Sequence, residues 1–234
     1  MARGRDWEAR FADGMHRRIN SATVWAADDP DGTVAELEAW YERRGIDPIF
    51  KLTDASAPGL DELLAGRGYL PDARVAVMTA DLPAGRRSAP AADVTLSDAP
   101  SEEWAGSFGD MAGYGPRQRR LLDATLGRID RRAVYASLRR EGSIVSVGMS
   151  VAEDRHAGVF EMITHPDHRG RGHAGSILDA LLGWMSGPGG ATVAYLQVLE
   201  GNQPAERLYR GAGFTPRYRY WYRVRSAGLS TTPH

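Results

Sequence analysis

The sequence predicts an α/β protein with a mixed β-sheet flanked by helices, and three observations support this fold class. Short apolar, β-branched stretches alternate with amphipathic stretches of helical period along most of the 234 residues. A glycine-rich turn at 164–175 joins one such strand to an amphipathic helix. A second strand follows directly at 191–198, and a helical segment lies within 202–214. Strands that alternate with helices build a sheet with helices on its faces.

The composition limits the classes of protein to consider. A formal net charge of −1 gives no overall attraction to nucleic acid or to a membrane surface. The absence of cysteine excludes disulfides, thiolate metal sites and an acyl-cysteine intermediate. The first residues lack the apolar core of a signal peptide, and no run is long enough to span a membrane. We therefore expect a soluble, cytoplasmic protein.

The first part of the chain begins with an amphipathic segment, for which both strand and helix remain open. Its apolar side chains recur at every fourth position: Trp7, Phe11, Met15 and Ile19. Turn residues at 28–32 then precede a helix that ends at Gly45. The following elements are predicted to be a strand at 48–52, a short helix at 60–69 and a strand at 74–79.

A linker is predicted next, because residues 83–90 are polar and bounded by prolines. We place it at 85–91, between an N-terminal module at 1–84 and a larger domain at 92–234. The larger domain starts with a strand at 94–96 and a helix capped by Asp98 or Ser101. A second helix, a hairpin and the remaining elements are expected at 121–129, 133–151, 158–163, 174–186, 191–198 and 218–224.

Arginines gather around the second of these helices. They are Arg117, Arg119, Arg120, Arg128, Arg131 and Arg132. Such a cluster favours either an anionic ligand or a solvated helix face, and the sequence leaves both interpretations open.

The turn at 164–175 has the properties of a phosphate-binding loop. Gly170 and Gly172 permit positive φ angles and a close approach of the backbone to ligand oxygens. The turn opens a helix, whose first N–H groups and dipole attract an anion. Arg169 and Arg171 add positive charge.

Two families of phosphate-binding loop fit these letters. Gly170 to Gly175 has the form G-x-G-x-x-G of dinucleotide-binding proteins, and Arg169 to Ala174 has the form R-x-x-G-x-A. A dinucleotide enzyme needs an acidic residue about 20 positions after the glycines, at a strand end, whereas Glu200 lies later, in a turn. An NAD(P)-binding oxidoreductase therefore remains the weaker alternative.

A second motif follows the next strand. Residues 202–214 have the form N-x-x-A-x-x-L-Y-x-x-x-G-F. With the R-x-x-G-x-A loop at this separation, the chain from about 92 to 225 resembles the GNAT superfamily of acyl-CoA N-acyltransferases. The resemblance implies a GNAT fold and an acetyl-CoA-dependent N-acetyltransferase. Acetyl-CoA would be a co-substrate, and the resemblance implies no metal ion.

The resemblance also assigns cofactor-binding residues. The strand end Met162, Ile163 and Thr164 would pair through its backbone with the pantetheine arm. Asn202 would meet that arm beyond the next strand, although asparagine is also a good turn residue. The pyrophosphate would lie on the loop residues Arg169, Gly170, Arg171, Gly172, His173, Ala174 and Gly175.

For the chemistry, Tyr209 matches the family's usual general acid, which protonates the departing thiolate. Some relatives carry a glutamate as base five residues before the asparagine, where this chain has Gln197. Glu161 is the best remaining carboxylate, because strand alternation would place Glu161, Ile163 and His165 on one face. His165 and His168 have suitable intrinsic pKa values but lie nearer the phosphate end.

The N-terminal module repeats part of this pattern. Leu63-Leu64-x-x-x-Gly68-Tyr69 before a strand parallels Leu208-Tyr209-x-x-x-Gly213-Phe214 before the last strand. The module has no glycine-rich loop, and leucine stands at 64 where tyrosine stands at 209. It is therefore predicted to be a degenerate GNAT-like module that packs against the second domain and shapes the acceptor site, and a purely structural role stays open as the alternative.

The resulting functional prediction is direct transfer of an acetyl group from acetyl-CoA to a primary amine in a ternary complex. The acceptor would be a small molecule or a protein N-terminus, with no nucleic-acid or membrane partner. The sequence leaves a homodimer open. A non-catalytic acyl-CoA-binding or regulatory protein is the alternative, because Gln197 replaces the usual base.

Overall fold

The computed structural model describes residues 1–12, 16–83 and 91–225. The chain divides into two compact units. One comprises Met1–Ala76 and the C-terminal strand from Tyr218, and the other comprises Val77–Arg217. The predicted linker at 85–91 lies, apart from residue 91, outside the described residues.

The first unit contains a β-sheet in the order β1-β2-β3-β4-β11-β5. The segment left open in the sequence becomes a short strand, β2, and a single 3-10 turn, η1. The elements of this unit are β1 (Ala2–Arg3), β2 (Trp7–Ala9), η1 (Arg17–Ile19), β3 (Ala22–Val24), α1 (Pro30–Glu42), β4 (Ile49–Thr53), α2 (Leu60–Gly66), β5 (Leu70–Asp81) and β11 (Thr215–Val224).

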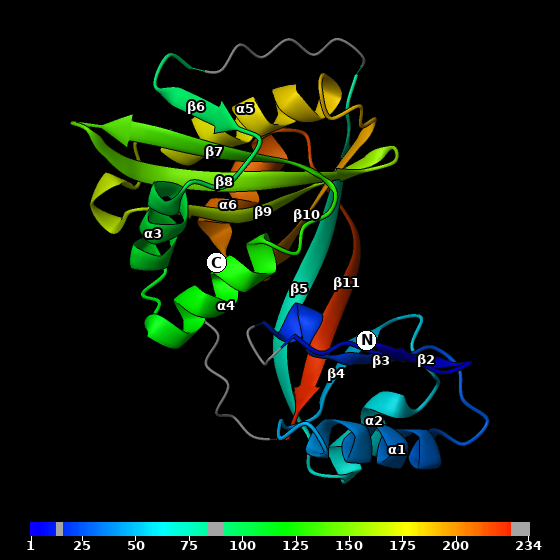
Figure 1. Ribbon diagram of the computed structural model, residues 1–234. Coiled ribbons are helices and arrows are strands. Elements are labelled where there is room, and N and C mark those ends of the chain that lie inside the picture. The colour runs from blue at the N-terminus through cyan, green and yellow to red at the C-terminus, as the bar shows by residue number, and fades with distance from the viewer. Residues whose placement is uncertain (13–15, 84–90, 226–234) are drawn as a thin grey trace. The chain divides into compact units, whose positions relative to one another are not determined.

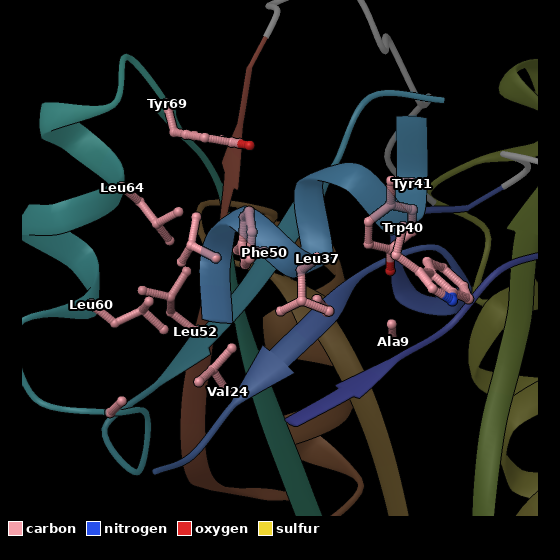
Figure 2. Packing of buried hydrophobic residues seen from close by; sticks show 13 residues of the cluster. Ala9, Val24, Leu37, Trp40, Tyr41, Phe50, Leu52, Leu60, Leu64 and Tyr69 are labelled. Carbon is pink, nitrogen blue, oxygen red and sulfur yellow. The ribbon is translucent and has the colours of Figure 1, made fainter. Parts of the chain in front are cut away.

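One face of β4 carries the core of the first unit. Phe50 and Leu52 are each 1% exposed and pack with buried side chains of α1 and α2. Figure 2 shows Leu37 and Tyr41 of α1 and Leu64 of α2 in this cluster. Successive strand residues point to opposite faces, so the residue between Phe50 and Leu52 projects away from this core.

The second unit contains the order β5-β10-β9-β8-β7-β6, in which β9 and β10 are parallel and β6 to β9 are antiparallel. This mixed sheet with flanking helices confirms the predicted fold class (Figure 1). The further elements are β6 (Val94–Ser97), α3 (Glu102–Met111), α4 (Pro116–Leu126), β7 (Arg132–Arg140), β8 (Ser143–Glu153), β9 (His156–Thr164), η2 (Pro166–His168), α5 (His173–Ser186), β10 (Val193–Leu199) and α6 (Gln203–Gly211).

Helix α5 covers one face of this sheet. Its predicted apolar stripe is buried, with Ile177 and Leu181 both 0% exposed. A Cβ at Gly148 of β8 would meet Ile177 at 2.8 Å and Leu181 at 3.4 Å, so the glycine lets the helix approach the strand. Helix α3 begins after Ser101, whose hydroxyl accepts from Trp104 N at 3.0 Å, and this selects Ser101 between the two predicted caps.

The two halves of the chain share a helix-to-strand turn, as the predicted repeat requires. Gly68 and Gly213 have φ angles of 84° and 94°. The next residue then returns to the helix: Tyr69 N donates to Leu64 O at 2.9 Å, and Phe214 N donates to Tyr209 O at 3.0 Å.

The strands after these two turns are exchanged between the units. The end of β5 belongs to the second unit, and the end of β11 belongs to the first. Strand β11 pairs antiparallel with β4 along Ile49–Thr53. The compact units therefore differ from the predicted domain at 92–234, because strand pairing places the last strand with the N-terminal unit. Among the described residues, no helix is long and apolar enough to cross a membrane.

Candidate functional site

The site predicted from the sequence lies where two parallel strands separate. Strands β9 and β10 pair over three residue pairs, from His156–Val193 to Gly158–Tyr195. Beyond this point β9 continues to Thr164 and β10 to Leu199. The other edge of β9 stays paired with β8 as far as Thr164. The edge of β9 that faces β10 therefore offers backbone groups to an extended ligand in the manner of an added strand.

A β-bulge lies at the same place. The β8–β9 register shifts between Val147 and Met149, so two residues, Glu161 and Met162, lie opposite Gly148. Glu161 has a φ of 51°, in the left-handed region that is costly for a residue with a Cβ. The bulge interrupts the expected alternation: Phe160 and Ile163 pair with residues of one face of β8. Simple alternation therefore does not determine whether Glu161 shares a face with Ile163 and His165, and that expectation stays a prediction.

The glycine-rich loop follows the end of β9 without a break. His165 N donates to Val145 O at 2.9 Å, and Arg169 Nε donates to Thr164 O at 3.3 Å. Gly170 and Gly172 adopt φ angles of 74° and 82°, as predicted. Ser176 N donates to Gly172 O at 3.1 Å. The first N–H groups of α5 have no intrahelical acceptor, because helix geometry provides none.

Positive charge gathers around this loop. The side chains of Arg169 and Arg171 are exposed and can reach an anion. His173, the first residue of α5, is 6% exposed. Burial lowers the pKa of His173, and the positive charge of Arg140 lowers it further. The loop therefore presents two arginines and a helix start, while His173 stays neutral near pH 7.

Asn202 begins α6. Its side-chain oxygen accepts from Ala205 N at 3.3 Å and so caps the helix. This is the turn chemistry that the sequence allowed as an alternative. Leu208 of α6 lies beside the start of α5, at 3.8 Å from a Cβ built on Gly175. Helix α6 is thus adjacent to the glycine-rich loop.

Tyr209 is a buried residue of α6. Its side chain is 8% exposed and its ring lies edge-on to Phe214, with centroids 6.1 Å apart. Burial raises the pKa of Tyr209 to about 12, because an apolar environment disfavours the phenolate. The phenol therefore keeps its proton at neutral pH.

The sequence did not indicate a second tyrosine of the candidate site, Tyr114. Tyr114, in the connection between α3 and α4, is 8% exposed and packs edge-on against Phe108. Burial raises its pKa to about 12, and the negative charge of Glu161 contributes to the shift. The two side chains are therefore close enough to interact. The Gly113-Tyr114-Gly115 turn was visible, but its proximity to Glu161 depends on the tertiary fold.

Part of the predicted arginine cluster is structural. Arg119 joins α4 to α3 through Asp110 at 2.7 Å and the carbonyl oxygens of Gly106 and Tyr114. Arg131 pairs with Glu153 at 3.1 Å. These contacts favour the interpretation in which the arginines belong to solvated helix and strand ends. The described residues contain no group of acidic or histidine side chains arranged to hold a metal ion.

Comparison with known proteins gives consistent matches. The family described as "Probable histone acetyltransferase Rv0428c C-terminal" matches residues 2–223. "Uncharacterized N-acetyltransferase YobR" of Bacillus subtilis is 26% identical over 94% of this chain and 90% of its own length. "Probable histone acetyltransferase Rv0428c" of Mycobacterium tuberculosis is 29% identical over 82% of this chain, which spans 58% of that protein.

Solved structures share the fold. A GCN5-related N-acetyltransferase from Kribbella flavida superposes with a TM-score of 0.68 at 19% identity, over 92% of this chain and 85% of that one. A tandem GNAT protein from the clavulanic acid biosynthesis pathway gives a TM-score of 0.64 at 15% identity, over 84% and 70% of the two chains.

Proposed function

The chain belongs to the Rv0428c C-terminal acetyltransferase family and has the GNAT fold of an N-acetyltransferase, and from this premise we propose its reaction and its site. The protein transfers an acetyl group from acetyl-CoA to a primary amine. The amine attacks the thioester directly while both substrates are bound. The acceptor is a small-molecule amine or a protein N-terminus.

The observation that carries this proposal is the separation of β9 from β10 directly before the glycine-rich loop. An acyl-CoA molecule has an extended amide-bearing arm and a pyrophosphate at its far end. The open edge of β9 at Met162, Ile163 and Thr164 suits the arm. The N–H groups of residues 170–175, with Arg169 and Arg171, suit the pyrophosphate.

The reaction then needs a base and an acid. The amine nitrogen forms a bond to the thioester carbonyl carbon, the C–S bond breaks, and the amine loses a proton while the thiolate gains one. We assign proton removal to Glu161, directly or through water; its position in the bulge, near the point where β9 and β10 separate, supports this assignment. We assign proton donation to Tyr209, whose burial keeps the phenol protonated.

Tyr114 is a candidate for positioning the acceptor. Its phenol interacts with the charge of Glu161 and comes from the connection between α3 and α4. A neutral phenol can hold an amine by a hydrogen bond while the carboxylate of Glu161 accepts its proton. We propose this role for Tyr114 in the same reaction.

A turnover assay with a library of acceptors tests the proposal. Release of free thiol from acetyl-CoA is followed with small amines, amino acids and peptides that bear a free N-terminus. Turnover that depends on one acceptor class supports the acetyltransferase. Micromolar binding of acetyl-CoA without turnover on any acceptor would instead support the non-catalytic alternative.

A further inference from the structure

The first unit contains the single lysine of the protein, Lys51, in a half-buried position on a strand. Lys51 of β4 is the only lysine among 29 Lys and Arg residues. It lies between Phe50 and Leu52, which point into the core with α1 and α2 (Figure 2). Lys51 therefore projects from the opposite face of β4. Arginine cannot be a nucleophile at neutral pH, so this amine is the sole side-chain amine of the protein that can be.

Two tyrosines of β11 cover the amine. Tyr222 pairs with Lys51 across the strands and Tyr220 pairs with Thr53, so both rings lie on the face of Lys51. They are 4% and 2% exposed. The Lys51 Nζ atom lies 4.1 Å from the centroid of the Tyr220 ring. The ammonium ion would thus be in a half-buried aromatic environment that removes much of its hydration.

The charges near Lys51 are mostly positive. Arg10 and Arg18 act on the amine from the segments around β2 and η1, and both favour its neutral form. Glu8 is the opposing charge, and it is bound to Arg10 Nε at 2.5 Å. The charge of Arg17 also acts on Tyr222, and Arg17 pairs with Asp72 at 2.6 Å.

Burial and this repulsion outweigh the attraction of the Tyr220 ring for a cation. The desolvation of the amine, followed by the charges of Arg10 and Arg18, lowers the pKa of Lys51 to about 8. At pH 7.4 about one-fifth of such an amine is neutral, against about one in a thousand for a lysine of ordinary pKa. The two tyrosines do not supply a negative charge that would stabilise the ammonium ion, because burial raises the pKa of Tyr220 and of Tyr222 and keeps both phenols neutral.

We propose that Lys51 is a modification site at which acyl thioesters acylate the protein directly. The neutral amine attacks the thioester carbonyl carbon, a C–N bond forms and the C–S bond breaks. The proton lost by the amine ends on the departing thiolate, so the products are an amide at Lys51 and a free thiol. The reaction needs no residue of the second unit and does not depend on the proposed acetyltransferase activity.

The test is acylation of the full chain by acetyl-CoA and by the S-acetyl ester of a simple thiol, followed by intact mass and peptide mapping. We expect one acetyl group on Lys51, with a rate that rises with pH to a midpoint near 8. The lower pKa raises the fraction of neutral amine but also makes that amine a weaker nucleophile. The two effects together predict a rate at pH 7.4 roughly tenfold above that of the same lysine in the chain unfolded in guanidinium. In Lys51→Arg, acylation should occur only at the N-terminal amine.

Two further variants separate this inference from the enzymatic proposal. Arg18→Gln removes a repelling charge, raises the pKa of Lys51 and should slow its acylation at pH 7.4 by about twofold. Arg171→Glu changes the loop of the second unit and should leave Lys51 acylation unchanged. A pH midpoint above 10, no acceleration over the unfolded chain, or loss of Lys51 acylation in Arg171→Glu would each overturn the proposal.

Discussion

At the scale of single residues, the proposed acid and base differ in what holds them. Tyr209 is held by burial on α6, whereas Glu161 is held by a bulge in β9 with a positive φ. A residue with a Cβ whose backbone lies in the left-handed region costs about 1–2 kcal/mol, and such strain is typical of functional positions. These two sites therefore respond differently to substitution.

Tyr209→Phe removes the phenol and keeps the buried ring. We expect kcat to fall by about 100-fold or more, with little change in the Kd of acetyl-CoA. In the unchanged protein the raised pKa, about 12, predicts no loss of activity from Tyr209 between pH 6 and about 10, because the phenol stays protonated there. Steady-state kinetics across pH, with thermal unfolding as the control for folding, checks both statements. An unchanged kcat in the variant would remove Tyr209 from the mechanism.

Glu161→Gly should separate stability from activity. Glycine relieves the positive φ and should stabilise the fold by about 1 kcal/mol relative to Glu161→Gln, which keeps the strain. Both variants lose the carboxylate and should lose about 100-fold in kcat. Equal melting temperatures for the two variants would show that the bulge is not strained, and retained activity would exclude Glu161 as the base.

At the scale of elements, the start of α5 is the critical feature. A Cβ at Gly172 would meet nothing within 4 Å, so Gly172→Ala introduces backbone strain without a clash. We expect weaker acetyl-CoA binding and a cost of about 1 kcal/mol in folding. Gly106→Ala, in the middle of α3 and without a positive φ, is the matched control and should bind normally. Calorimetric titration of both variants measures the difference.

The attachment of β11 to α2 predicts a dependence of stability on pH. Arg223 binds both carboxylate oxygens of Asp61 at 2.8 Å, and Trp221 Nε1 donates to it at 2.8 Å. The bond from Arg223 holds the pKa of Asp61 below its usual value. Its contribution is therefore present above about pH 4, where the unfolded carboxyl ionises, and is lost as pH falls through the folded pKa.

Asp61→Asn should consequently be less stable than the unchanged protein at pH 6, and the difference should shrink near pH 3. Urea unfolding at the two pH values measures it. A difference that stays constant with pH would mean that the bond from Arg223 does not depend on the charge of Asp61.

Many features of the individual helices and turns could be predicted from the sequence. The apolar stripe of α5, the positive φ of Gly170 and Gly172, and the shared helix-to-strand turn follow from local periodicity and residue type. The bulge was not predictable from the sequence, because glutamate has no preference for the left-handed backbone conformation that Glu161 adopts. The proximity of Tyr114 to Glu161 and the pairing of β11 with β4 join distant segments, so local rules cannot show them.

At the scale of the whole molecule, each unit includes the end of a strand that begins in the other unit: the end of β5 in the second unit and the end of β11 in the first. A fragment of residues 92–234 keeps β11 but lacks its partner β4, and it lacks β5 beside β10. We expect this fragment to aggregate through the exposed strand edges. Coexpression with residues 1–91 should restore a soluble complex, which size-exclusion chromatography detects. A soluble, cooperatively unfolding fragment would contradict this account of the exchange.

The central claim is that acetyl-CoA binds at the loop between β9 and α5. The most direct measurement is calorimetric titration with acetyl-CoA, and with NAD and NADP in parallel, of the unchanged protein, of Arg171→Glu and of Arg155→Glu. Arg155 is an exposed arginine in the turn before β9, so its variant has the same change in charge away from the loop. We predict micromolar binding of acetyl-CoA that Arg171→Glu weakens at least tenfold and Arg155→Glu leaves unchanged. Equal affinities in all three proteins, or binding of NAD or NADP alone, would contradict the claim.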